Sequence, residues 1–195
     1  MPTKRYGAAA VCSGKALVVA GGGGKSDSTY LNIVEVMDTE TLQWSTASSL
    51  TFALRYASAK IWLDCIYLLG YDTSEDSKYR QVLACSKADL LQSCQSQSLQ
   101  AVWHRVADLP VHSSSCVTLC GQLLAVGGCD KSLKRPTTSI HQYNPATNCW
   151  EVISHMPTAR ISPLVAVLPG NKLMVVGGYI DGGKTDKVEI ASLQE

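Results

Sequence analysis

The chain lacks the features that mark several large classes of protein. Its 17 basic and 16 acidic residues leave a formal net charge of +1, so it has no strong field of one sign to attract nucleic acid or a membrane surface. No apolar run reaches the roughly 18 residues of a membrane-spanning helix, and no apolar signal core precedes Gly14. A sustained helical period is absent as well. These absences favour a soluble all-β protein without nucleic-acid or membrane partners.

The cysteines and histidines do not form a recognisable site. Cys12, Cys116 and Cys120 fall inside predicted strands without the spacing of a disulfide framework, which predicts free thiols in a reducing cytoplasm. No two histidines have the spacing of zinc ligands. Residues 24–26 read Gly-Lys-Ser, but Val19 stands where a phosphate-binding loop requires its first glycine. We therefore expect no metal and no cofactor.

Four short apolar segments ending in glycine recur along the chain, and three of them end in a doubled glycine. The segments are LVVAGG at residues 17–22, IYLLGY at 66–71, LLAVGG at 123–128 and LMVVGG at 173–178. Their first glycines lie 49, 57 and 50 positions apart. A period of about 50 residues predicts a tandem array in which each unit is one small antiparallel sheet.

A tryptophan follows the glycines in three of the units. Trp44 and Trp150 each come 22 positions after the second glycine, whereas Trp103 comes 32 positions after Tyr71. The second unit therefore carries an insertion of about ten residues. The intervals place this insertion within residues 87–100, a polar, Gln/Ser-rich segment that we expect to form a mobile surface loop.

Each unit is predicted to contain four strands. The first strands are expected at residues 8–12, 57–61, 115–119 and 164–168, and the third strands at residues 33–37, 80–85, 139–143 and 188–191. The apolar segments that end in glycine supply the second strands, and the tryptophans mark the fourth.

The doubled glycines, the spacing from Tyr143 to Trp150 and the arginine after a proline resemble the kelch repeat over nearly the whole chain. Met37 stands in place of the tyrosine in the first unit, and Tyr71 in place of the second glycine in the second unit. The resemblance implies a kelch-type β-propeller, all-β, in which each unit forms one four-stranded antiparallel blade. It also implies one domain, residues 1–195, with repeats at about 5–54, 55–112, 113–159 and 160–195. A β-sandwich is the alternative fold, and it would not explain the period.

The length leaves room for just under four blades of about 50 residues. The last repeat lacks a tryptophan-bearing strand. We therefore expect an arc of about four blades that belongs to a longer kelch protein, whose missing blades would complete it. A closed ring of four blades and completion in a homodimer are the alternatives.

The resemblance implies that partners bind at one rim, where the loops between second and third strands meet the loops that enter each blade. The residues at matching positions in the loops that enter each blade, here called entry loops, are Arg5, Arg55, Ser113 and Arg160. Tyr30 and Asn32 come from the loop between the second and third strands of the first unit, here called its inner loop. Arginines near the channel mouth can hold a carboxylate or phosphate through bidentate hydrogen bonds. Alternatively, each arginine bonds backbone carbonyls or an acidic residue of the adjacent blade. Ser113 interrupts the ring of arginines.

Three classes of function remain. The first is a non-catalytic protein-interaction module that binds a peptide or folded domain, which in the family often means substrate recognition for a ubiquitin ligase. The second is a cytoskeletal, actin-associated scaffold, and the third is a kelch-type sugar-modifying enzyme. We favour the first, because no catalytic constellation is evident in the sequence.

Overall fold

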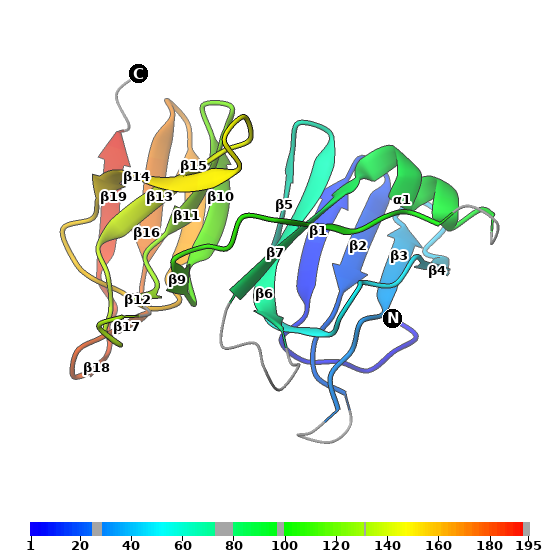
Figure 1. Ribbon diagram of the computed structural model, residues 1–195, viewed down its shortest axis with the longest axis horizontal. Helices are drawn as coiled ribbons and strands as arrows, with labels where there is room; N and C mark the ends of the chain where they lie inside the picture. Colours follow the sequence, from blue (N-terminus) through cyan, green and yellow to red (C-terminus); the bar gives the residue numbers. More distant parts are fainter. Residues whose placement is uncertain (25–28, 73–79, 97–99, 131, 193–195) are drawn as a thin grey trace. The chain divides into compact units, whose positions relative to one another are not determined.

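The computed structural model describes residues 1–24, 29–72, 80–96, 100–130 and 132–192 (Figure 1). The chain divides into two compact units, Met1–Val106 and Ala107–Glu195, and each contains two antiparallel sheets of three or four strands, here called blades. The predicted all-β class and the four antiparallel blades are confirmed. In the part of the chain that the structure describes, no helix is long and apolar enough to cross a membrane.

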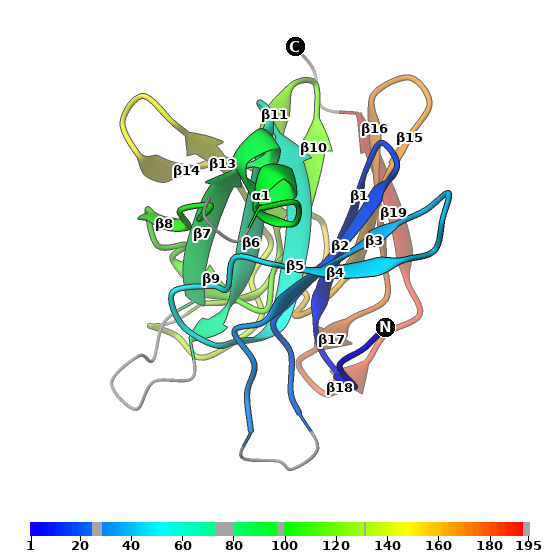
Figure 2. The same ribbon diagram turned by 90° about the vertical axis from the view of Figure 1, so that its right-hand side faces the viewer.

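The first unit holds blades 1 and 2, and in each the strands lie in chain order (Figure 2). Blade 1 consists of β1 (Ala9–Ser13), β2 (Ala16–Ala20), β3 (Val34–Asp38) and β4 (Trp44–Ala47). Blade 2 consists of β5 (Leu54–Trp62), β6 (Cys65–Asp72), β7 (Arg80–Ser86) and β8 (His104–Val106), with helix α1 (Lys87–Ser93) between the last two strands. The first strands of the two blades, β1 and β5, are in contact.

The second unit holds blades 3 and 4. Blade 3 consists of β10 (Ser115–Leu119), β11 (Gln122–Val126), β13 (Ser139–Asn144) and β14 (Cys149–His155), and blade 4 of β15 (Leu164–Leu168), β16 (Lys172–Val176) and β19 (Val188–Ser192). Two short ribbons extend from these sheets. They are β9 (Val111–His112) paired with β12 (Cys129–Asp130), and β17 (Tyr179–Ile180) paired with β18 (Gly183–Lys184). The first strands of the two blades, β10 and β15, are again in contact.

The second strand of each blade lies inside its sheet, which explains its uninterrupted apolar sequence. Val18, Leu68, Leu124 and Leu173 are at most 2% exposed. A strand that is covered on both faces gains from apolar residues at every position rather than at alternate ones. The predicted first and third strands agree with the observed ones to within a few residues at their ends.

The doubled glycines are needed because backbones meet closely where neighbouring blades adjoin. The amide of Gly22 donates to the Leu54 carbonyl at 2.7 Å, and the amide of Gly128 donates to the Arg160 carbonyl at 2.8 Å. Both glycines have positive φ, +99° and +114°. A β-carbon on Gly128 would lie 2.6 Å from the carbonyl oxygen of His112, a distance that no side chain tolerates.

Blade 2 departs from this arrangement. Its β6 continues through Gly70, and Tyr71 pairs with Arg55 just as Gly23 pairs with Tyr6 in blade 1. The second glycine is therefore missing from blade 2, and the prediction that Tyr71 replaces it is wrong. The register of β5 and β6 shifts between Arg55 and Ser58. This irregularity accommodates the missing glycine.

The predicted mobile loop at residues 87–100 is wrong in its first half, because α1 forms there. The hydroxyl of Ser86 accepts a hydrogen bond from the amide of Asp89 at 3.3 Å, which caps the helix. Leu90 and Ser93 are buried, and the Ser93 hydroxyl accepts from the amide of Ser48 at 3.1 Å. The insertion therefore packs against blade 1 through α1, while residues 97–99 lie outside the described part.

Two tryptophans donate hydrogen bonds to backbone carbonyls outside their own sheets. Trp103 of blade 2 is 3% exposed, and its indole N–H donates to the carbonyl of Ser48 at 3.2 Å. Trp150 of blade 3 donates in the same way to the carbonyl of Ala107 at 2.9 Å. Ser48 directly follows β4 of blade 1, and Ala107 is the first residue of the second unit. Trp103 therefore stabilises the packing of blade 2 on blade 1, as expected from the sequence.

Candidate functional site

The entry loops of the four blades can be aligned by their backbone geometry. In each loop, one residue bridges to the position after the glycines and the next residue has a positive φ. The bridging residues are Tyr6, Arg55, His112 and Ile161, and the residues with positive φ are Gly7, Tyr56, Ser113 and Ser162. The equivalents of Arg5 are therefore Leu54, Val111 and Arg160. The predicted matching of Arg55 and Ser113 with Arg5 is wrong by one and two positions, since the loops differ in length.

Arg5 lies inside blade 1. Its guanidinium donates to the carbonyls of Gly21 at 2.8 Å and Ile33 at 2.9 Å, and forms an ion pair with Glu35 at 2.8 Å. The two side chains are 1% and 3% exposed. Thr3 donates from its hydroxyl to the other oxygen of Glu35 at 2.7 Å. Arg5 is thus held by its own blade and presents almost no surface to a partner.

Arg160 repeats this arrangement in blade 4. It donates to the carbonyls of Gly177 at 3.1 Å and Lys187 at 2.7 Å, and pairs with Glu189 at 3.0 Å. Burial opposes ionisation of Glu189, but hydrogen bonds from Thr158 and Arg160 outweigh it and lower the pKa of the carboxyl group. The Arg160 side chain is fully buried. Both arginines therefore bond backbone carbonyls and an acidic residue, as in the alternative interpretation of the sequence. The acidic residue belongs to their own blade and not to the adjacent one.

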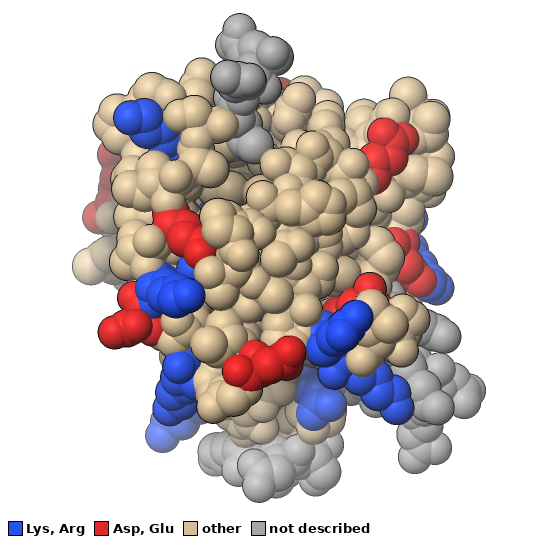
Figure 3. Space-filling model, turned by 90° about the vertical axis from the view of Figure 1, so that its left-hand side faces the viewer, with Lys and Arg blue, Asp and Glu red and all other residues tan. Residues whose placement is uncertain are grey.

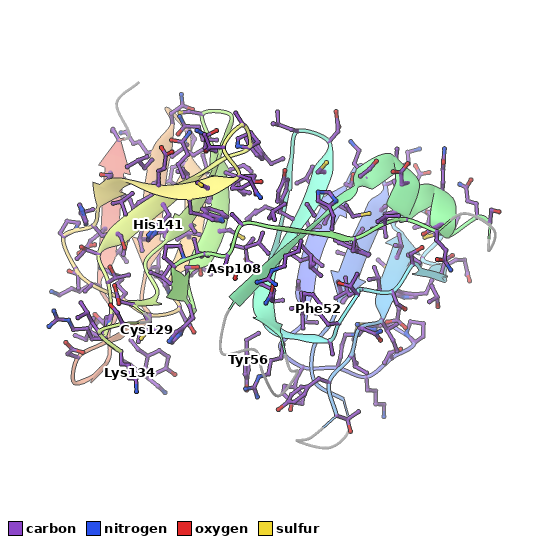
Figure 4. All side chains as sticks on the ribbon, in the orientation of Figure 1. Phe52, Tyr56, Asp108, Cys129, Lys134 and His141 are labelled. Carbon is purple, nitrogen blue, oxygen red and sulfur yellow. The ribbon has the colours of Figure 1, made fainter. Side chains whose placement is uncertain are left out.

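Blades 2 and 3 have other residues at the two positions of this ion pair. The strand register places Leu83 of blade 2 and His141 of blade 3 at the position of Glu35 and Glu189. His141 is labelled in Figure 4. Blade 2 thus carries two leucines, Leu54 and Leu83, each fully buried, where blade 1 carries an arginine and a glutamate. The same backbone position accepts either an ion pair or an apolar pair.

At the loop end of the first unit, two tyrosines, Tyr30 and Tyr56, lie against Arg55, and Tyr6 lies beside Tyr30 because both pair with Gly23. We call Tyr6, Tyr30, Arg55 and Tyr56 the tyrosine–arginine cluster. The guanidinium of Arg55 lies 5.0 Å from the ring centre of Tyr30 and 5.7 Å from that of Tyr56, and donates to the Tyr30 hydroxyl at 2.7 Å. Such stacking fixes the orientation of the guanidinium.

Two glycines leave room for the rings of Tyr6 and Tyr56. A β-carbon on Gly23 would lie 2.3 Å from the ring of Tyr6, and one on Gly7 would lie 3.1 Å from the ring of Tyr56. Tyr6 and Tyr56 are nevertheless 44% and 55% exposed, and Tyr56 lies at the loop end in Figure 4. The cluster is therefore an exposed aromatic surface on a fixed backbone.

The other predicted site residues lie apart from this cluster or serve the backbone. Asn32 is exposed, and its amide donates to the carbonyl of Leu50 at 3.4 Å, which joins the inner loop to the entry loop of blade 2. Ser113 is half-buried in the second unit, where its carbonyl accepts from the amide of Ser162 at 2.6 Å. The structure thus brings Tyr30 and Arg55 together, and adds Tyr6 and Tyr56, which the sequence reasoning missed. The Arg-Tyr pairs at residues 5–6 and 55–56 were the available signal.

The cysteines are free, and the described residues contain no group of potential metal ligands. Burial, together with the nearby Asp89 carboxylate, raises the pKa of the Cys85 thiol to about 12. We expect iodoacetamide at about pH 8 to alkylate the exposed Cys12, Cys120 and Cys149 within minutes and to leave Cys85 unmodified in the folded chain, since only the thiolate reacts. Peptide mass spectrometry with and without denaturant measures this. Equal labelling of Cys85 in both samples would contradict the burial.

Comparison with known proteins agrees with the repeat structure. The Kelch motif family matches residues 4–51 and 110–157, which correspond to blades 1 and 3. Kelch-like protein 35 is 42% identical over 73 residues in Mus musculus and 46% identical over 70 residues in Homo sapiens. These segments cover 37% and 35% of this chain but only 12% of each relative.

A solved structure supports the fold over the full length. The structure of YjhT superimposes with a TM-score of 0.73 and 15% identity, covering 100% of this chain and 68% of the other. At this identity the likeness concerns the fold alone. The family match, with the doubled glycines that recur along the chain, shows that it belongs to the kelch-repeat family, and its blades have the fold of a kelch-type β-propeller.

Proposed function

We propose that this chain is a non-catalytic protein-binding module whose tyrosine–arginine cluster contacts the partner. Membership of the kelch-repeat family supports a protein-interaction role. Within a longer cytoplasmic protein, in which residues 1–195 form one kelch-repeat domain, this role would be substrate recognition for a ubiquitin ligase. The free cysteines are consistent with a reducing compartment.

The main support for the proposal is that the cluster consists of tyrosines and an arginine. Tyrosine and arginine are enriched among the residues that dominate protein–protein binding energies, because they bury a large area and keep a polar end. Here the rings of Tyr6 and Tyr56 are exposed, and the Arg55 guanidinium is held between two tyrosines. A partner segment with a carboxylate group would pair with Arg55 while its apolar atoms cover the rings.

Removing the side chain of Arg55 or Tyr56 is expected to weaken binding while the protein stays folded. Peptides selected from a random displayed library on the full chain serve as ligands, and their affinities are measured by fluorescence anisotropy. Arg55→Ala or Tyr56→Ala should weaken the selected peptides by at least about tenfold, since truncating a central interface residue has this effect. The selected peptides should share an aspartate, a glutamate or a free carboxyl terminus.

Arg105→Ala is the matched control, because Arg105 is an exposed arginine on β8 outside the cluster. It should bind like the wild type, and circular dichroism should show that all three variants are folded. Selected peptides that bind the Arg55 and Tyr56 variants as tightly as the wild type would reject the cluster as the site.

A further inference from the structure

Tyr56 is unusual among the entry-loop residues that have a positive φ. The equivalent residues of the other blades are Gly7, Ser113 and Ser162. Tyr56, by contrast, carries a large side chain at a φ of +48°. A bulky residue rarely adopts this conformation, and residues that do so cluster at functional sites. The register of β5 and β6 also shifts between Arg55 and Ser58, so Tyr56 lies on a bulge, a feature that redirects side chains. The backbone of blade 2 thus presents this ring at the surface, where it is 55% exposed.

The hydroxyl ends of the other two tyrosines of the cluster are held more closely than that of Tyr56. The Tyr30 hydroxyl accepts a hydrogen bond from the guanidinium of the cluster at 2.7 Å. The hydroxyl end of Tyr6 lies over Gly23, since a β-carbon there would be 2.3 Å from its Cζ and 2.7 Å from its hydroxyl oxygen. Tyr56 instead meets Gly7 with the Cδ1 and Cε1 atoms of its ring. A group added at the phenol oxygen therefore fits better on Tyr56 than on Tyr6 or Tyr30.

A negative charge on Tyr56 would act on Arg55. The centre of the Tyr56 ring lies 5.7 Å from the guanidinium, and the two residues are adjacent in the chain. A phosphate group on tyrosine carries a charge of about −1.5 to −2 near pH 7 and three strong acceptor oxygens. It would attract the guanidinium and repel a carboxylate that approaches it. A phosphate on Tyr56 would therefore compete with the carboxylate of a partner for Arg55.

We propose that Tyr56 is a phosphorylation site and that its phosphate prevents partners from binding at the tyrosine–arginine cluster. The co-reactants are a protein tyrosine kinase and ATP with Mg²⁺. The phenol oxygen of Tyr56 forms a bond to the γ-phosphorus of ATP, the bond from that phosphorus to its bridging oxygen breaks, and ADP leaves. The phenol proton passes to the general base of the kinase and from there to water. The loss of binding rests on the proposed function, whereas the modification of Tyr56 does not.

Tyr179 is a tyrosine of similar exposure in the second unit. It lies on β17 and is 49% exposed. Its nearest charged neighbour along the chain is Asp181. Figure 3 shows basic and acidic side chains next to one another toward the loop end of the second unit. A phosphate on Tyr179 would therefore add charge to a mixed surface outside the cluster, which makes this residue the matched control.

The site of modification is tested by incubating the full chain with a panel of purified tyrosine kinases and ATP. Peptide mass spectrometry then locates the phosphate. We expect phosphate on Tyr56 and none on Tyr143, which is 4% exposed. Tyr56→Phe should abolish the first product, and circular dichroism should show that this variant is folded. A panel that leaves Tyr56 unmodified would overturn the proposal.

The effect on binding is measured with a full chain in which phosphotyrosine is introduced at position 56 during translation, so that the result does not depend on the kinase. The ligands are the peptides selected on the unmodified chain, and their affinities are measured by fluorescence anisotropy. We expect binding at least about tenfold weaker than that of the unmodified chain, and unchanged binding when the phosphotyrosine stands at position 179 instead.

Equal affinity of the chains with and without phosphate on Tyr56 would overturn the proposal. If the same peptides lose affinity for Arg55→Ala, the proposed function stands and only its regulation by Tyr56 fails. If they bind Arg55→Ala as tightly as the wild type, the proposed function fails, and the regulation that rests on it fails with it.

Discussion

Replacing Glu35 by leucine is expected to destabilise the first unit by about 3–5 kcal/mol, because the change leaves Arg5 buried without its counter-ion. The pair is 1% and 3% exposed, so water cannot replace the lost carboxylate. The Thr3 hydroxyl also loses its acceptor. Urea unfolding followed by hydrogen exchange of β2 and β3 measures the change in the free energy of unfolding.

The double variant Arg5→Leu with Glu35→Leu is expected to recover most of this loss. Blade 2 carries Leu54 and Leu83 at the equivalent positions, and both are fully buried. An apolar pair of similar volume is often as stable as a buried ion pair, because neither ion then has to leave water. A double variant as unstable as Glu35→Leu alone would show that the backbone of blade 1 cannot accept the apolar pair. A loss below about 1 kcal/mol in Glu35→Leu would show that the pair contributes little.

Replacing Gly128 by alanine is expected to destabilise the second unit by at least about 2 kcal/mol, through both backbone strain and a steric clash. Its φ of +114° is closed to residues with a β-carbon, and the added atom would lie 2.6 Å from the His112 carbonyl oxygen. The strand must move, which also disturbs the hydrogen bond from Gly128 to the Arg160 carbonyl. Thermal unfolding should therefore begin in the second unit.

Gly121→Ala separates the two contributions. Gly121 also has a positive φ, +70°, but nothing lies within 4 Å of the position of an added β-carbon. This variant should lose only about 1–2 kcal/mol, the conformational cost of the left-handed region. If Gly121→Ala and Gly128→Ala lose equal stability, the close approach of backbones is not the reason for the doubled glycine.

The sequence predicted the strands well because their signal is local. Apolar second strands, turn residues and the glycine period recur in register, so the blades could be located without knowledge of tertiary contacts. Helix α1 was missed because the search was for a sustained helical period, whereas α1 spans only Lys87–Ser93. Ser86 followed by Asp89 was the local signal for its start.

The candidate site could be predicted only in part, because loop lengths vary between blades. The sequence analysis matched Ser113 with Arg160, but the backbone bridges show that Val111 is the equivalent of Arg160. Spacing alone could not separate an arginine buried inside a blade from a partly buried one among tyrosines either. Arg5 and Arg55 occupy neighbouring positions of the repeat, yet one bonds carbonyls inside its blade and the other stacks between tyrosines.

The most direct test of the proposed function is site-specific photocrosslinking at the tyrosine–arginine cluster. A photoreactive phenylalanine analogue replaces Tyr56 or, as a control, Leu42, which is 65% exposed in the turn between β3 and β4, at the opposite end of blade 1. The ligands are the peptides selected on the full chain. Crosslinking at position 56 and not at position 42 is the predicted result. Crosslinking at position 42 alone would contradict the account and place the partner at the other end of the blade.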